Sequence, residues 1–116
     1  MTWPTELRVD KERRTLTVTF DTAERFVLPA EYLRVESPSA EVQGHGPSQK
    51  QIVAGKRHVR IERIEPVGNY AARLIFDDGH DTGLYSWDCL YELGRDQSRK
   101  WSDYLLALGR RGLARD

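Results

Sequence analysis

The sequence predicts a single α+β domain that is rich in β-strand, with antiparallel hairpins, a short helix and a C-terminal amphipathic helix. Three observations predict this class. Short segments in which apolar and polar residues alternate occupy the first part of the chain, as in half-buried strands. An Asp78-Gly79 turn signal separates two further apolar segments. Apolar residues then recur at helical spacing between residues 101 and 108. The domain spans residues 1–116, with a core over about residues 5–109.

The first strands follow from alternation. Between residues 15 and 20, threonine alternates with larger apolar residues, which is typical of a strand with one buried face. Charged or polar turns separate this segment from its neighbours, so hairpins are expected. The strands predicted here are residues 5–10, 15–20 and 25–28.

A short helix and a long loop come next. Pro29 has no amide hydrogen, which ends a strand but costs nothing in the first turn of a helix, so residues 29–35 are predicted to be helical. Residues 36–51 are rich in Ser, Pro, Gly, Gln and His and are expected to form a loop. Long loops in small domains are often functional, so this segment is a candidate for a site.

A second hairpin follows the loop. Its strands are predicted at residues 58–66, with a bulge, and at residues 70–76 and 81–85. A two-residue turn is expected between the last two strands, with Gly79 at a positive φ angle because glycine has no Cβ to clash.

Two helices are predicted to close the domain. Ser86 is expected to cap the first, and Gly94 to end it in the left-handed conformation. The second opens at residues 96–98, and residues 110–116 form a polar tail that is expected to fray. Trp87 and Trp101 are expected inside. The apolar face of the last helix is predicted to comprise Trp101, Tyr104, Leu105 and Leu108.

Composition excludes several classes of protein. A formal net charge of zero argues against a nucleic-acid partner, which normally requires a basic surface. A single cysteine, Cys89, rules out an intramolecular disulfide and fits a reducing compartment. Neither a signal peptide nor an apolar run of the roughly 20 residues that span a bilayer is visible. We therefore expect a cytoplasmic protein without membrane contact; its oligomeric state is left open.

Three short motifs carry a family resemblance. Gly68-Asn69-Tyr70, Asp77-Asp78-Gly79-His80 and Tyr85-Ser86-Trp87, supported by Leu33-Arg34 and residues 37–41, resemble the gamma-butyrobetaine hydroxylase-like N-terminal domain family. The resemblance covers roughly residues 7–94. It implies a domain that is appended to oxygenases in some proteins and to Mrp-type iron–sulfur carrier ATPases in others. A protein partner from the oxygenases or the iron–sulfur assembly machinery is therefore expected.

The resemblance also implies a metal position. The hydroxylases hold a structural zinc ion with three cysteines and one histidine in this domain, and His80 matches that histidine. The cysteine positions fall on Ser37, Ser39 and Val42. A hydroxyl is a poor zinc ligand beside a thiolate, and a valine is none. We therefore expect the family's zinc to be absent.

Two interpretations of His80 stay open. It is either a turn residue that bonds locally, to the backbone or to a neighbouring aspartate, or a ligand in a rebuilt iron or zinc site. The resemblance places residues 36–51 beside the hairpin, so the other ligands would come from that segment. They would be His45 and either Glu36 or Glu41, a carboxylate-rich set that suits a harder metal ion.

No catalytic constellation is visible, since the chain has no serine elbow, phosphate loop or dinucleotide glycine motif. Cys89 is interpreted as a small buried apolar residue. The leading hypothesis is a non-catalytic accessory module that works through protein–protein interaction, without a cofactor. The alternative is a protein that binds iron or zinc through His80 and residues 36–51.

Overall fold

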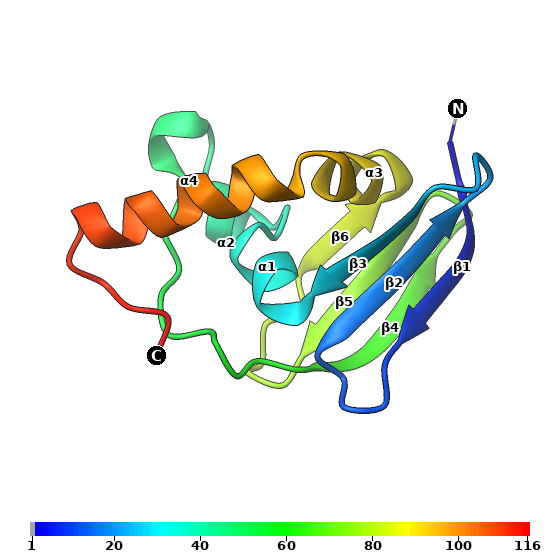
Figure 1. Cartoon of the computed structure of the whole chain (residues 1–116), viewed down its shortest axis with the longest axis horizontal. Helices are drawn as coiled ribbons and strands as arrows, with labels where there is room; N and C mark the ends of the chain where they lie inside the picture. The colour runs from blue at the N-terminus through cyan, green and yellow to red at the C-terminus, as the bar shows by residue number, and fades with distance from the viewer. Residues whose placement is uncertain (1) are drawn as a thin grey trace.

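Two antiparallel sheets of three strands each form the body of the protein, which a computed structural model describes over residues 2–116. The sheets lie one in front of the other in Figure 1, and the predicted α+β class is confirmed. The first sheet has the order β1 (Pro4–Val9), β2 (Thr15–Phe20), β3 (Arg25–Pro29). The second has the order β4 (Ile61–Val67), β5 (Ala71–Phe76), β6 (Gly83–Ser86).

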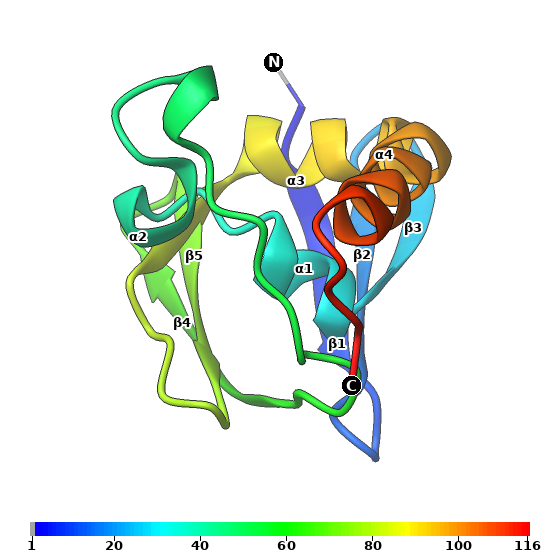
Figure 2. The same cartoon turned by 90° about the vertical axis from the view of Figure 1, so that its left-hand side faces the viewer.

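Four α-helices accompany the sheets in the described residues. They are α1 (Ala30–Val35), α2 (Ala40–Gln43), α3 (Trp87–Arg95) and α4 (Gln97–Arg110). Figure 2 shows α1 in the middle of the molecule, with α3 and α4 at one side of it. The helices of residues 2–116 are all too short or too polar to cross a bilayer.

The segment expected to be a loop is partly helical. Residues 36–51 contain α2 and a 3₁₀ turn, η1 (Pro47–Gln49). The hydroxyl of Ser39 accepts a hydrogen bond from the Glu41 amide at 3.2 Å, which caps the first turn of α2. This cap acts together with the burial of Val42 and with the contacts of Ser39 and Glu41 to the β5–β6 turn.

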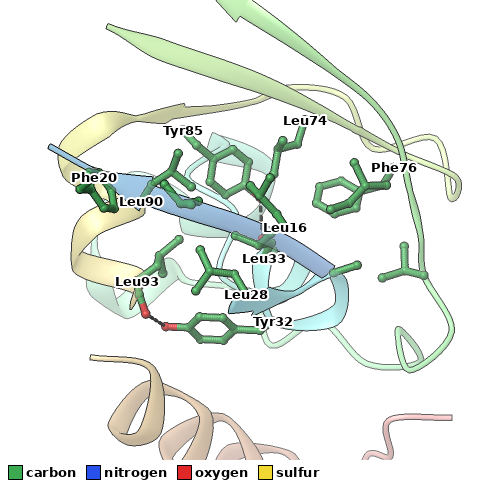
Figure 3. Close-up of a cluster of buried hydrophobic side chains, with 14 residues drawn as sticks. Leu16, Phe20, Leu28, Tyr32, Leu33, Leu74, Phe76, Tyr85, Leu90 and Leu93 are labelled. Atoms are coloured by element: carbon green, nitrogen blue, oxygen red, sulfur yellow. Dashed lines mark hydrogen bonds between the residues drawn. The ribbon is translucent and has the colours of Figure 1, made fainter. Parts of the chain in front are cut away.

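The main core lies between the sheets and against α1 and α3. Leu16, Val18 and Phe20 of β2 are fully buried, as their alternation with threonine predicts. Figure 3 shows side chains from β2, β3, α1, β5, β6 and α3 converging there. Two buried tyrosines satisfy their hydroxyls on backbone carbonyls: Tyr32 donates to Leu93 at 2.6 Å and Tyr85 to Leu33 at 2.5 Å.

The turn between β5 and β6 is longer than predicted. Gly79 has the expected positive φ of 91°. However, the Phe76 amide donates to the His80 carbonyl at 3.0 Å, which leaves three residues in the turn instead of two. Strand β6 consequently begins at Gly83, two residues later than expected. The bulge predicted for the preceding strand is confirmed as a register shift in β4 between Ile61 and Arg63.

The prediction for Gly94 was wrong. Ser86 does cap α3 by accepting from the Cys89 amide at 3.1 Å, but the helix continues through Gly94 to Arg95. A Cβ built on Gly94 would lie 2.3 Å from Cγ of Phe26. Glycine is therefore needed here because an aromatic ring of β3 packs directly on the helix backbone.

Parts of the prediction for the last helix were also wrong. Tyr104 and Leu108 are buried, but Leu105 is 40% exposed. Trp87 and Trp101 are half-buried at the margin of the core. The stripe of α4 that faces the core is thus narrower than the spacing predicted.

The polar tail at residues 110–116, for which fraying is predicted, pairs with a distant segment in the structure. The amides of Gly55 and Arg57 donate to the carbonyls of Ala114 and Arg115, each at 3.0 Å. Because this pairing joins segments far apart in the sequence, no local pattern predicts it.

We expect Gly94→Ala to lower the free energy of unfolding by about 1–3 kcal/mol, because the new methyl group meets the Phe26 ring. Gly109→Ala is the matched control: Gly109 also lies in a helix, but nothing stands within 4 Å of its added Cβ. That change should stabilise the protein by up to about 1 kcal/mol through helix propensity. Urea denaturation measures both, and equal effects would show that Phe26 moves aside freely.

Candidate functional site

A polar cluster joins the β5–β6 turn to the segment that follows α1. The His80 ring lies between two side chains of that segment, with Nε2 2.8 Å from Ser37 Oγ and Nδ1 3.1 Å from Glu41 Oε2. A second bridge, between Ser39 Oγ and Thr82 Oγ1, measures 2.7 Å. We call these five residues the His80 cluster. The two segments lie together, as the resemblance implied.

The His80 cluster is closed on its inner side. Ser37 is fully buried and the His80 side chain is only 3% exposed. The Ser37 hydroxyl also accepts from the Ser39 amide at 3.2 Å. A Cβ on Gly83 would lie 2.7 Å from this hydroxyl, so the backbone of β6 covers it tightly. Two members of the cluster reach the surface: Glu41, whose side chain is 64% exposed, and Thr82.

The residues present do not fit the zinc ion of the family. The three positions that match its cysteines hold Ser37 and Ser39, whose hydroxyls are bonded to protein groups, and Val42, which is a buried aliphatic residue. Zinc in structural sites takes four thiolate or imidazole ligands. Within residues 2–116, no group of three or more His, Cys, Asp or Glu side chains is placed to hold a metal ion.

Of the ligands suggested for a rebuilt site, only Glu41 lies against His80. The carboxylate of Glu36 is buried and accepts from Lys50 Nζ at 2.9 Å. His45 is exposed, and its amide donates to the Gln49 side chain at 3.0 Å. A metal bound by His80, His45 and these glutamates stays a prediction, and it would require the intervening segment to rearrange.

His80 does bond to a neighbouring aspartate, as one interpretation expected, but through its backbone amide and not through its ring. The His80 amide donates to Asp78 Oδ1 at 3.0 Å, whereas the ring bonds to residues about 40 positions earlier. Reasoning from the turn alone missed these ring partners. The resemblance indicated them, because it placed Ser37 at a ligand position beside His80 and Glu41 among the ligands of a rebuilt site.

Asp78 links the turn to two further elements, and nothing in the sequence indicated this. Its carboxylate accepts from Arg34 Nε of α1 at 2.8 Å and pairs with Lys56 Nζ at 2.6 Å. Burial opposes its charge, but the bonds from Lys56, the His80 amide and Arg34 together hold its pKa at about 2. The neighbouring Arg34 Nη1 is buried and has no hydrogen-bond partner among the described residues.

The order Ser37, His80, Glu41 is that of the hydroxyl, imidazole and carboxylate in hydrolytic triads. Geometry alone is not sufficient for such chemistry, since a substrate must also reach the nucleophile. Ser37 has no exposed surface, so its hydroxyl is inaccessible in this conformation. The cluster as it stands is built to hold two segments together.

Cys89 is the other reactive group that the sequence singled out. It lines a cavity of about 260 Å³ together with Glu36, Lys50 and Lys100. Burial, followed by the charge of Glu92, raises the pKa of its thiol to about 11. The thiol is therefore protonated at neutral pH, as expected of a cysteine that serves as a small apolar residue.

Comparison with known proteins identifies similar domains. Residues 7–91 match the family model described as gamma-butyrobetaine hydroxylase-like, N-terminal. A protein known from an NMR solution structure is 47% identical, with a TM-score of 0.86, over 100% of this chain and 91% of the other. A second NMR solution structure is also 47% identical, with a TM-score of 0.85, over 99% of this chain and 86% of the other.

A third structure comes from Acidithiobacillus ferrooxidans and is described as a protein of unknown function of the DUF971 family. It is 38% identical, with a TM-score of 0.66, over 78% of this chain and 91% of the other. Among curated proteins, none matches the chain.

We expect the stability of the protein to fall in the pH range that lies just below about 6.5, the ordinary pKa of a histidine. Burial, followed by the charge of Arg34, lowers the pKa of His80. In this window the unfolded state therefore binds more protons than the folded state, so acid favours unfolding. Thermal melts of the wild type and of His80→Gln measure this. The variant should lose less of its thermal midpoint on acidification, and an identical slope would show that another group titrates.

Proposed function

We propose that the chain, which belongs to the gamma-butyrobetaine hydroxylase-like N-terminal domain family, is a non-catalytic accessory module that docks onto a partner protein. The observation that carries the proposal is the closed His80 cluster. Both ring nitrogens of His80 are bonded to protein side chains, and the Ser37 hydroxyl is inaccessible. His80, at the position where the resemblance implies a metal ligand in the hydroxylases, thus links the β5–β6 turn to the segment after α1. This favours docking through the outer surface as the function.

The nature of the partner follows from the resemblance. Domains of this kind are appended to oxygenases and to Mrp-type iron–sulfur carrier ATPases, so a separate copy would act on one of these from outside. Such partners place the protein in the cytoplasm, which a single cysteine also fits.

The outer face of α4 is a suitable docking surface. Leu105 and Leu106 are adjacent and are 40% and 56% exposed. Charged residues, among them Arg99 and Asp103, flank this pair on the same helix. An apolar centre with a polar rim is the usual anatomy of a protein interface. A few residues near the centre of an interface usually supply most of the binding energy.

Calorimetric titration against two purified candidates, an Mrp-type ATPase and an oxygenase, tests the proposal. We expect one of them to bind, and a Leu105→Ser/Leu106→Ser double variant to bind it about tenfold more weakly or worse. Leu84→Ser is the matched control, because Leu84 is equally exposed (46%) but lies on β6. Absence of binding to both candidates would argue against the proposal.

The alternative function, binding of iron or zinc, is favoured by the contact between Glu41 and His80. Metal analysis of protein purified without an affinity tag distinguishes the two. Stoichiometric metal that is lost in His80→Gln would support the alternative. If the accessory-module proposal is right, the metal content stays well below stoichiometric. A strong chelator then leaves the thermal midpoint unchanged, because the core folds without a structural metal ion.

A further inference from the structure

Residues 113–116, which we call the end segment, lie along residues 55–57. Two backbone hydrogen bonds of 3.0 Å join them, from Gly55 to Ala114 and from Arg57 to Arg115. Figures 1 and 2 both show the red end of the chain beside the green segment that precedes β4. An extended segment docked through its backbone is a common mode of peptide recognition.

The side chain of Arg115 enters a site that is built for an arginine. Its Nε and Nη2 donate to the two carboxylate oxygens of Glu31 at 2.8 and 2.7 Å. The guanidinium carbon lies 5.2 Å from the centre of the Trp101 ring. A carboxylate fork beneath an aromatic face distinguishes arginine from lysine, because only the planar guanidinium can satisfy both at once.

The buried carboxylate makes a cation at this position necessary. The Glu31 side chain is 7% exposed, while Arg115, its bidentate partner, is 32% exposed. A carboxylate that is buried without a partner is strongly unfavourable. Glu31 therefore belongs to the body of the domain, whereas the cation that satisfies it arrives on a separate segment.

The end segment fills this site incompletely. A cavity of about 240 Å³ remains beside Arg115, lined by Pro29, Tyr32, Gln97, Glu31 and Trp101. The other residues of the end segment are exposed, including Leu113 at 42%. The cavity has room for a large apolar side chain that the end segment does not place there.

Displacing the end segment would disturb little else. It follows α4 after Gly112, whose φ of 65° marks the change of direction. Apart from Arg115, its side-chain contacts include surface ion pairs of Asp116 with Arg57 and with His58, the latter at 3.9 Å. Surface ion pairs contribute little to stability.

We propose that the groove formed by Glu31, Trp101 and residues 55–57 binds an extended, arginine-bearing segment of a partner protein, which displaces the end segment and fills the adjacent cavity with an apolar side chain. This inference rests on the proposed docking function and names the chemistry of the partner. A second copy of the chain is a poorer occupant, because it would bring the same residues and leave the same cavity empty.

The test uses the full chain carrying Arg115→Ala, which leaves Glu31 without its arginine partner. The ligand is the capped peptide Gly-Leu-Phe-Arg-Asp, which is residues 112–116 with phenylalanine in place of Ala114. The matched control peptide has lysine in place of arginine. In calorimetric titrations, we expect the variant to bind the arginine peptide about tenfold more tightly than the wild type does. We expect the variant to bind the lysine peptide about tenfold more weakly than it binds the arginine peptide. Adding Glu31→Gln should remove the preference for arginine over lysine.

Nuclear magnetic resonance provides a second measurement, which does not depend on the stability of the variant. In the wild type, excess arginine peptide should shift the amide signals of Gly55 and Arg57 and the indole signal of Trp101. Equal affinity for the two peptides, or unchanged signals at all three groups, would overturn the inference.

Sedimentation of the wild type tests exchange between copies: a dimer that Arg115→Ala abolishes would overturn the inference in favour of a second copy. Because the accessory-module proposal is tested separately through Leu105 and Leu106, failure of the peptide to bind would leave that proposal standing.

Discussion

The burial of α1 is the constraint on which the rest of the structure depends. Four consecutive residues of this helix reach four different parts of the molecule. Glu31 binds the end segment, Tyr32 donates to α3, the Leu33 carbonyl accepts from β6, and Arg34 binds the β5–β6 turn. Because Tyr32 and Leu33 are fully buried, the helix has one orientation. Its polar residues are thereby aimed at their partners.

This arrangement explains why the His80 cluster holds without the thiolates of a zinc site. Ser37 follows α1 directly and is carried against the turn by the same helix that anchors Asp78 through Arg34. Buried polar groups are tolerated when each finds a partner, and here hydroxyl, imidazole and carboxylate satisfy one another.

Two sites lie at the two ends of α1: the His80 cluster, and the groove formed by Glu31, Trp101 and residues 55–57. They differ in how their polar groups are satisfied. At the end near Ser37, the side chains are bonded to one another, and Ser37 and His80 are buried. At Glu31, a buried carboxylate is satisfied by a cation from a segment that is otherwise exposed. The first arrangement stabilises the fold, and the second leaves a polar group that can exchange its partner. The proposed docking function would use both: a rigid body, and a surface on which one contact can replace another.

Local patterns in the sequence determined the alternation within the strands, the cap at Ser86 and the backbone conformation of Gly79. Alternation in β2, the Ser86 cap and the positive φ of Gly79 depend on neighbouring residues alone, so they could be predicted, as could the family. The tertiary structure decided what depends on distant partners. Position 94 requires glycine because Phe26 packs on the helix backbone there, and the end segment lies where Gly55, Arg57 and Glu31 bind it. His80 could be singled out from its motif, but its ring partners come from about 40 residues away. Contacts between segments so far apart leave no periodic signal in the sequence, because they depend on how the buried α1 orients the chain on either side of it.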